Sequence, residues 1–142
     1  MKYLVMVSHG TFAPGLHSVL KMLAGGNRED ILSTSLEDGM SADQFAQRFG
    51  TVIEPVSGED EVILLADIIG GSPLTTALDV LTKKGMLART TAFGGMNLPM
   101  ALTAAMMKDA METSDLKSTL VSEAQEAIRE LELKFDSDDE EI

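Results

Sequence analysis

Two residues capable of acid–base or nucleophilic chemistry stand at the ends of apolar runs. His9 ends the run that begins at Tyr3 and precedes Gly10, while Asp67 follows the apolar segment 62–66. A neutral imidazole is a nucleophile near physiological pH, and a carboxylate bonded to one ring nitrogen leaves the lone pair of the other free to attack. We therefore interpret His9 as a candidate nucleophile and Asp67 as the carboxylate that orients it.

Two glycine-containing turns supply groups that suit an anion. Ser72 precedes Pro73, an order that predicts a helix capped by Ser72 with Pro73 as its first residue. Backbone N–H groups at a helix start, together with the helix dipole, favour bound phosphate. An imidazole, an orienting carboxylate and such a cradle indicate phosphoryl capture on nitrogen. The expected phosphate-binding residues are Gly10, Thr11, Gly70, Gly71 and Ser72.

These residues need a scaffold that brings two strand ends together. Apolar segments predict strands at 3–8, 31–36, 62–66 and 89–93, and helical patterns begin near Pro14, Ser41, Pro73 and Pro99, with a last helix over about 115–135. This alternation predicts an α/β fold with a doubly wound, mainly parallel sheet, helices on both faces and strand order 2-1-3-4. The first and third strands are then neighbours, so His9 and Asp67 meet at the switch point.

Length and charge restrict the class of protein. The 142 residues suit one domain, expected over 1–135, followed by an acidic tail at 136–142. The net charge of −12 argues against unassisted binding to nucleic acid or to an anionic membrane. The chain shows neither a signal-peptide pattern nor an apolar segment long enough to span a bilayer, so we expect a soluble cytoplasmic protein.

Composition also weighs against several other chemistries. The chain has no cysteine and only two histidines, so we expect no metal site and no thiol nucleophile. Ser72, His9 and Asp67 resemble a hydrolase triad in type, but the G-x-S-x-G elbow is missing. A flavin or nucleotide site is disfavoured because the first turn is neither G-x-G-x-x-G nor a Walker loop, and we expect no cofactor. His17 falls inside the first helix and is interpreted as a surface or groove residue.

At three separated blocks the sequence resembles a known family. The blocks are Val7-Ser8-His9-Gly10, Asp67-Ile68-Ile69-Gly70-Gly71-Ser72-Pro73 and Gly95-Met96-Asn97-Leu98-Pro99-Met100. Together they resemble the IIA component of the mannose-type phosphoenolpyruvate-dependent sugar phosphotransferase system. Their order and spacing run through most of the domain, which makes the resemblance specific.

The resemblance implies a phosphoryl carrier. His9 would match the histidine that accepts a phosphoryl group from phospho-HPr and passes it to a IIB protein, and Asp67 the carboxylate that orients it. Ser72 and the adjacent glycine amides would match the phosphate-contacting turn. The resemblance also implies contact with a membrane only indirectly, through the transporter, and a homodimer that exchanges an edge strand. No candidate for that strand stands out near the C-terminus.

Two other interpretations of the same histidine remain open. A related phosphocarrier domain serves a dihydroxyacetone kinase instead of a transporter, and the second and third blocks favour the sugar-transport interpretation over it. A regulatory module controlled by histidine phosphorylation is the second alternative.

Overall fold

The computed structural model describes residues 1–135, so the expected acidic tail lies outside the described residues. Strands and helices alternate along the chain as the sequence predicts. No helix in the described part is long and apolar enough to cross a membrane. The elements, in order, are β1 (Lys2–His9), α1 (Phe12–Leu23), β2 (Ile31–Leu36), α2 (Ala42–Val52), β3 (Glu61–Ala66), α3 (Ser72–Lys83), the 3₁₀ turn η1 (Leu87–Arg89), β4 (Thr90–Phe93), α4 (Leu98–Met107) and α5 (Thr113–Glu126).

The four strands form one parallel sheet with the order β2-β1-β3-β4, which confirms the predicted topology. β1 lies in the centre and pairs with β2 on one side and β3 on the other. His9 lies opposite Leu36 of β2, and Val7 lies opposite Ala66 of β3. The carboxyl ends of β1 and β3 therefore lie side by side.

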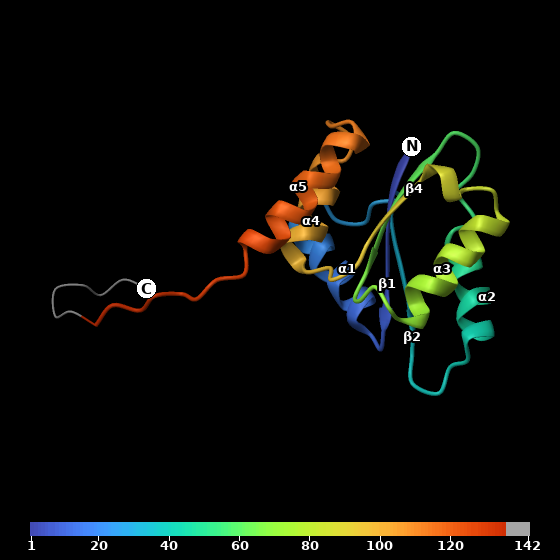
Figure 1. The fold of residues 1–142 in the computed structure, drawn as a ribbon, viewed down its shortest axis with the longest axis horizontal. Helices are drawn as coiled ribbons and strands as arrows, with labels where there is room; N and C mark the ends of the chain where they lie inside the picture. Colours follow the sequence, from blue (N-terminus) through green and yellow to red (C-terminus); the bar gives the residue numbers. More distant parts are fainter. Residues whose placement is uncertain (136–142) are drawn as a thin grey trace.

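Helices cover both faces of the sheet (Figure 1), with α1, α4 and α5 on one face and α2 and α3 on the other. Alternate residues of β1 serve the two cores: Leu4 and Met6 pack toward α1 and α4, while Val5 and Val7 pack toward α2 and α3. All four side chains are fully buried. Burial on both faces explains why the strand reads as a continuous apolar run.

Two helices begin earlier than the sequence predicts. α1 begins at Phe12 and not at Pro14, because the buried Ser8 hydroxyl accepts the N–H of Ala13 at 2.7 Å and so satisfies a donor of the first turn. α3 begins at Ser72, and Gly71, not Ser72, is its capping residue. Ser72 therefore lies inside the first turn of α3.

The last helix is shorter than predicted. α5 ends at Glu126, and residues 127–135 have no regular secondary structure and extend away from the rest of the chain (Figure 1). The buried face of the segment stops with the helix: Leu120 and Ala124 are buried, but Ile128 and Leu131 are exposed. The period of the segment changes at the same place, since Leu131, Leu133 and Phe135 alternate with charged residues, a strand pattern and not a helical one.

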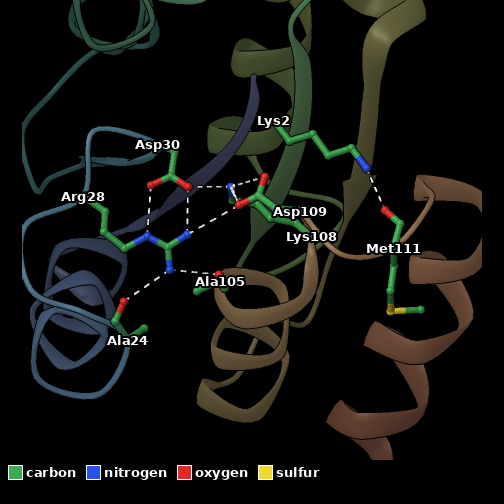
Figure 2. Close-up of polar contacts among 8 residues, drawn as sticks. All are labelled: Lys2, Ala24, Arg28, Asp30, Ala105, Lys108, Asp109 and Met111. Atoms are coloured by element: carbon green, nitrogen blue, oxygen red, sulfur yellow. Dashed lines mark hydrogen bonds and ion pairs between the residues drawn. The ribbon is translucent and has the colours of Figure 1, made fainter.

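A group of ion pairs ties the helices to the opposite, amino-terminal end of the sheet (Figure 2). Asp30, just before β2, accepts two hydrogen bonds from Arg28 at 3.0 and 2.7 Å and one from the Lys108 ammonium group at 2.5 Å. Arg28 also donates to the carbonyl oxygens of Ala24 and Ala105, at the ends of α1 and α4. Lys108 is fully buried and contacts Asp109 as well. We call Arg28, Asp30, Lys108 and Asp109 the amino-end network.

Candidate functional site

His9 and Asp67 form a direct pair at the carboxyl end of the sheet. The Nδ1 atom of His9 lies 2.8 Å from Oδ2 of Asp67, and the backbone N–H of His9 donates to the same oxygen at 2.9 Å. The second carboxylate oxygen accepts the N–H of Ile68 at 2.9 Å. One carboxylate therefore holds both the main chain and the ring of His9, as predicted from the strand order.

This pairing determines which ring nitrogen is available. An ionised carboxylate only accepts hydrogen bonds, so Nδ1 of His9 carries the proton in the neutral ring. Nε2 then has a free lone pair and lies on the side of the ring away from Asp67. The His9 side chain is 45% exposed, whereas that of Asp67 is 16% exposed. The imidazole is thus accessible to a partner, while the carboxylate that holds it is mostly covered.

The carboxylate of Asp67 stays ionised despite its partial burial. Burial alone raises its pKa, but hydrogen bonds from the backbone and ring of His9, and from the backbone of Ile68, outweigh that effect. The net result is a pKa below the ordinary value of 3.8. Asp67 is therefore a permanent acceptor for His9 Nδ1 at neutral pH.

Gly71 lies against the imidazole ring. A Cβ atom placed on Gly71 would come within 2.6 Å of Cε1 and 3.2 Å of Nε2 of His9. No side chain fits in that space, so the backbone of the β3–α3 turn approaches the ring directly. Among the described residues, the N–H groups of Gly70 and Gly71 donate to no other backbone carbonyl, and the N–H of Ser72 belongs to the unpaired first turn of α3. The turn beside Nε2 therefore offers free donors to an anion.

The remaining predicted site residues differ in whether their polar groups are free. Ser72 and Thr11 are exposed, and their hydroxyl groups make no hydrogen bond within residues 1–135. The N–H of Gly10, in contrast, donates to the carbonyl oxygen of Leu36 at 2.9 Å. The expectation that this amide is a free donor is therefore wrong, because the ladder between β1 and β2 extends one bond beyond His9.

His17 has a partner that the sequence did not suggest. Its Nδ1 atom lies 2.7 Å from the hydroxyl oxygen of Ser33 on β2, and the side chain is half-buried. Burial, with a smaller contribution from the nearby Lys21, lowers the pKa of His17. His17 therefore joins α1 to β2 through its contact with Ser33, which is a structural role.

A supporting loop behind Asp67 was not assigned a role from the sequence. Gly95 N–H donates to the carbonyl oxygen of Asp67 at 2.9 Å, and Met96 N–H donates to that of Ala66 at 3.0 Å. A Cβ atom on Gly94 would lie 2.2 Å from Cγ1 of Ile69, so the two turns are in close contact. The paired glycines before Asn97 were the available signal, since consecutive glycines often mark a close backbone approach.

The surface around His9 is apolar as well as polar. Three large apolar side chains, at the start of α1 and in the β3–α3 turn, are exposed by 48%, 53% and 72%: Phe12, Ile68 and Ile69. Exposed apolar groups of this size suit contact with a protein partner better than contact with a small polar molecule. Within residues 1–135 no group of three His, Cys, Asp or Glu side chains is placed to hold a metal ion.

A parallel α/β domain with this strand order is a fold shared with known proteins. The family described as the fructose IIA component of the phosphotransferase system, EIIA-man, matches residues 3–121. The chain therefore belongs to this IIA family, and the resemblance seen in the three sequence blocks is confirmed.

Individual relatives agree with this assignment. The fructose-specific EIIA component of the phosphotransferase system from Bacillus subtilis is 22% identical over 125 residues, which span 88% of this chain and 83% of that protein. The mannose/sorbose-specific IIA subunit from Enterococcus faecalis has a similar fold, with a TM-score of 0.78, 22% identity and coverage of 96% of this chain and 100% of that one. The IIA protein associated with the fucose utilization operon of Streptococcus pneumoniae gives a TM-score of 0.76 at 24% identity, covering 91% and 92% of the two chains.

Proposed function

We propose that this chain accepts a phosphoryl group on Nε2 of His9 from phospho-HPr and passes it to a IIB protein during sugar uptake. The observation that carries the proposal is the double hydrogen bond from His9 to Oδ2 of Asp67, which leaves Nε2 as the free nitrogen. Membership of the IIA family supports phosphoryl transfer in general. The donor, the acceptor and the atom are our proposal.

The transfer step follows from the geometry of the pair. The Nε2 lone pair of His9 attacks phosphorus, and the bond between phosphorus and the donor breaks as the new nitrogen–phosphorus bond forms. The ring then carries a positive charge, which the adjacent Asp67 carboxylate offsets. The free amides at the start of α3, with Ser72 and Thr11, stabilise the phosphoryl oxygens. The reverse sequence delivers the group to the acceptor.

The same proposal assigns the exposed apolar residues a role in docking. Phe12, Ile68 and Ile69 are exposed in the segments that follow His9 and Asp67, and they suit contact with HPr and with IIB in turn. The proposal places this exchange in the cytoplasm, with the membrane reached only through the transporter. No cofactor or nucleic acid takes part.

The experiment is phosphoryl labelling from phosphoenolpyruvate with enzyme I and HPr. We expect one acid-labile phosphate on the wild-type chain and on His17→Ala, and none on His9→Ala, whose melting temperature should stay close to wild type because the side chain is half exposed. Labelling that persists in His9→Ala would contradict the proposal. Transfer onward to IIB, and not to a dihydroxyacetone kinase, distinguishes the two carrier interpretations.

We also propose that the chain forms a homodimer through its C-terminal segment, residues 127–135. Within the described residues β4 pairs only with β3, so its other edge is open beside a groove of about 700 Å³ that includes Phe93 and Val121. In the C-terminal segment, Leu131, Leu133 and Phe135 are exposed by 65%, 52% and 87%. An alternating segment of this kind can add a strand to the open edge of a second copy.

The dimer is tested by the molar mass in solution. We expect a dimer for the wild-type chain and for Glu132→Gln, and a monomer for Leu133→Lys, which places a charge among the alternating apolar side chains. A monomeric wild-type chain, or a dimeric Leu133→Lys variant, would show that the segment does not join two copies.

A further inference from the structure

Asn97 joins the start of α4 to the end of α5. Its side-chain oxygen accepts the N–H of Met100 at 3.0 Å and so caps α4. Its side-chain nitrogen donates to the carbonyl oxygen of Ala124, in the last turn of α5, at 3.0 Å. A helix cap needs only the oxygen of this amide. The nitrogen therefore makes a second, separate connection that capping does not require.

This connection leads to the pair at the strand ends through the backbone. Residues Gly94–Asn97 form the loop between β4 and α4, and Gly95 N–H holds the carbonyl oxygen of Asp67 at 2.9 Å. The neighbouring Met96 N–H holds that of Ala66 at 3.0 Å. The side chain of Asp67 in turn holds the ring of His9 at 2.8 Å. The path consists of these hydrogen bonds and the short stretches of main chain between them, so a shift of the loop changes where the Asp67 carboxylate points.

We propose that Asn97 is a positioning residue for the reaction: by holding α5 it fixes the loop that sets Asp67, and through Asp67 the tautomer and direction of the His9 ring. The assignment rests on the proposed role of His9. It concerns the side-chain nitrogen of Asn97, while the oxygen serves α4. Asn97 itself lies outside the surface that receives the phosphoryl group, since its contacts are with α4 and α5.

Asn97→Asp separates the two tasks of the side chain. A carboxylate still caps α4, but it cannot donate to Ala124 and repels that carbonyl oxygen. Asn97→Ser gives a second variant, in which the short hydroxyl caps α4 without reaching α5. Thr113→Val is the matched control, because it removes the 2.7 Å hydrogen bond from Thr113 to Glu61 at the other end of α5.

Two measurements are made on each variant: the rate of phosphoryl acceptance from phospho-HPr, and the ¹⁵N chemical shifts of the His9 ring in the unphosphorylated protein. We expect both Asn97 variants to accept the group about 10-fold more slowly, as removal of an outer hydrogen-bond partner commonly does, and their ring signals to move toward a mixture of tautomers. Thr113→Val should keep the wild-type values of both.

The ring signals decide the proposal independently of the donor. Wild-type ring signals in both Asn97 variants, or an equal displacement in Thr113→Val, would overturn the positioning role. If the wild-type chain accepts no phosphoryl group, the proposed function fails, but the ring signals still report whether Asn97 orients His9.

Discussion

The two ends of the sheet use aspartate in opposite ways. At the carboxyl end, Asp67 holds one side chain, His9, which remains 45% exposed. At the amino end, Asp30 holds both Arg28 and Lys108, and Lys108 is completely buried. Asp67 leaves the Nε2 atom of His9 free, whereas Asp30 shares its oxygens between the cations of Arg28 and Lys108.

Loss of the carboxylate should therefore affect stability at the amino end and the orientation of His9 at the carboxyl end. A buried ion whose partner is removed is left without compensation in a region that water does not reach, which is strongly destabilising. A half-exposed imidazole that loses its carboxylate is hydrated instead, and the loss falls on its orientation. Both ends of the sheet have a carboxylate. What distinguishes the candidate functional site from the structural network is the exposure of the side chain that the carboxylate holds.

The largest effect is expected at the amino end. Asp30→Ala leaves the buried Lys108 and its neighbour Arg28 with only the exposed Asp109 carboxylate of the network, and we expect the free energy of unfolding in denaturant to fall by about 3–5 kcal/mol. Asp109→Ala is the control: Asp109 contacts the same lysine at 3.1 Å but is 63% exposed, so we expect a loss below about 1 kcal/mol. Equal losses in the two variants would show that burial does not distinguish the two carboxylates.

Acid should weaken the same network at a defined pH. The hydrogen bonds from Arg28, opposed by burial and reinforced by Lys108, lower the pKa of Asp30 from 3.8 to about 2. A lowered pKa in the folded state means that the stabilisation is complete above pH 3.8 and is lost as the pH falls toward 2. We expect it to amount to about 2 kcal/mol. The measurement is the difference in unfolding free energy between wild type and Asp30→Asn across this range, and a difference independent of pH would contradict the assignment.

At the carboxyl end the effect should appear in the rate. In Asp67→Asn the amide can donate to Nδ1 of His9, which moves the ring proton to Nε2 and removes the attacking lone pair. We expect phosphoryl acceptance to slow by about 10–100-fold, with a melting temperature close to wild type. Rapid-quench labelling from phospho-HPr measures the rate. An unchanged rate would make Asp67 a structural residue like Asp30.

The smallest effect is expected from Ser72→Ala. Its hydroxyl makes no hydrogen bond within residues 1–135, so its loss should leave the unfolding free energy unchanged. Acceptance should slow by about 5-fold, corresponding to about 1 kcal/mol for one hydrogen bond to the phosphoryl group. Removal of the exposed Ser118 hydroxyl on α5 provides the control. A loss of stability without a change in rate would assign Ser72 to the fold.

Much of this arrangement could be predicted because it depends on periodicity and on strand ends. The continuous apolar runs of β1 and β3 indicate strands buried on both faces, and parallel order then brings His9 to Asp67. The amino-end network escaped prediction because Arg28, Asp30 and Lys108 follow no spacing rule. Their contact depends on how the ends of α1 and α4 meet, which a single sequence does not encode as a pattern.

The predicted boundaries of α1 and α5 were wrong for local reasons. α1 begins before Pro14 because a side chain from the preceding strand, Ser8, replaces the expected cap. α5 was extended to residue 135 because Ala127 and Ile128 continue its apolar spacing, although the alternation that follows is that of a strand. The N–H of Gly10 was expected to be a free donor, but it donates to the carbonyl oxygen of Leu36 on the neighbouring strand. How far two strands stay paired beyond their ends cannot be predicted from one strand alone.

The single oxygen that receives both N–H groups of His9 has a further consequence. One hydrogen bond fixes the main chain of His9 and the other fixes its ring, so under the proposed function the phosphoryl group on Nε2 is presented in one direction. Gly71 closes the space on one side of the ring. Under the proposed function, HPr and IIB then use the same approach to Nε2 in turn. We therefore expect an excess of unphosphorylated HPr to slow delivery to IIB by competing for the same surface.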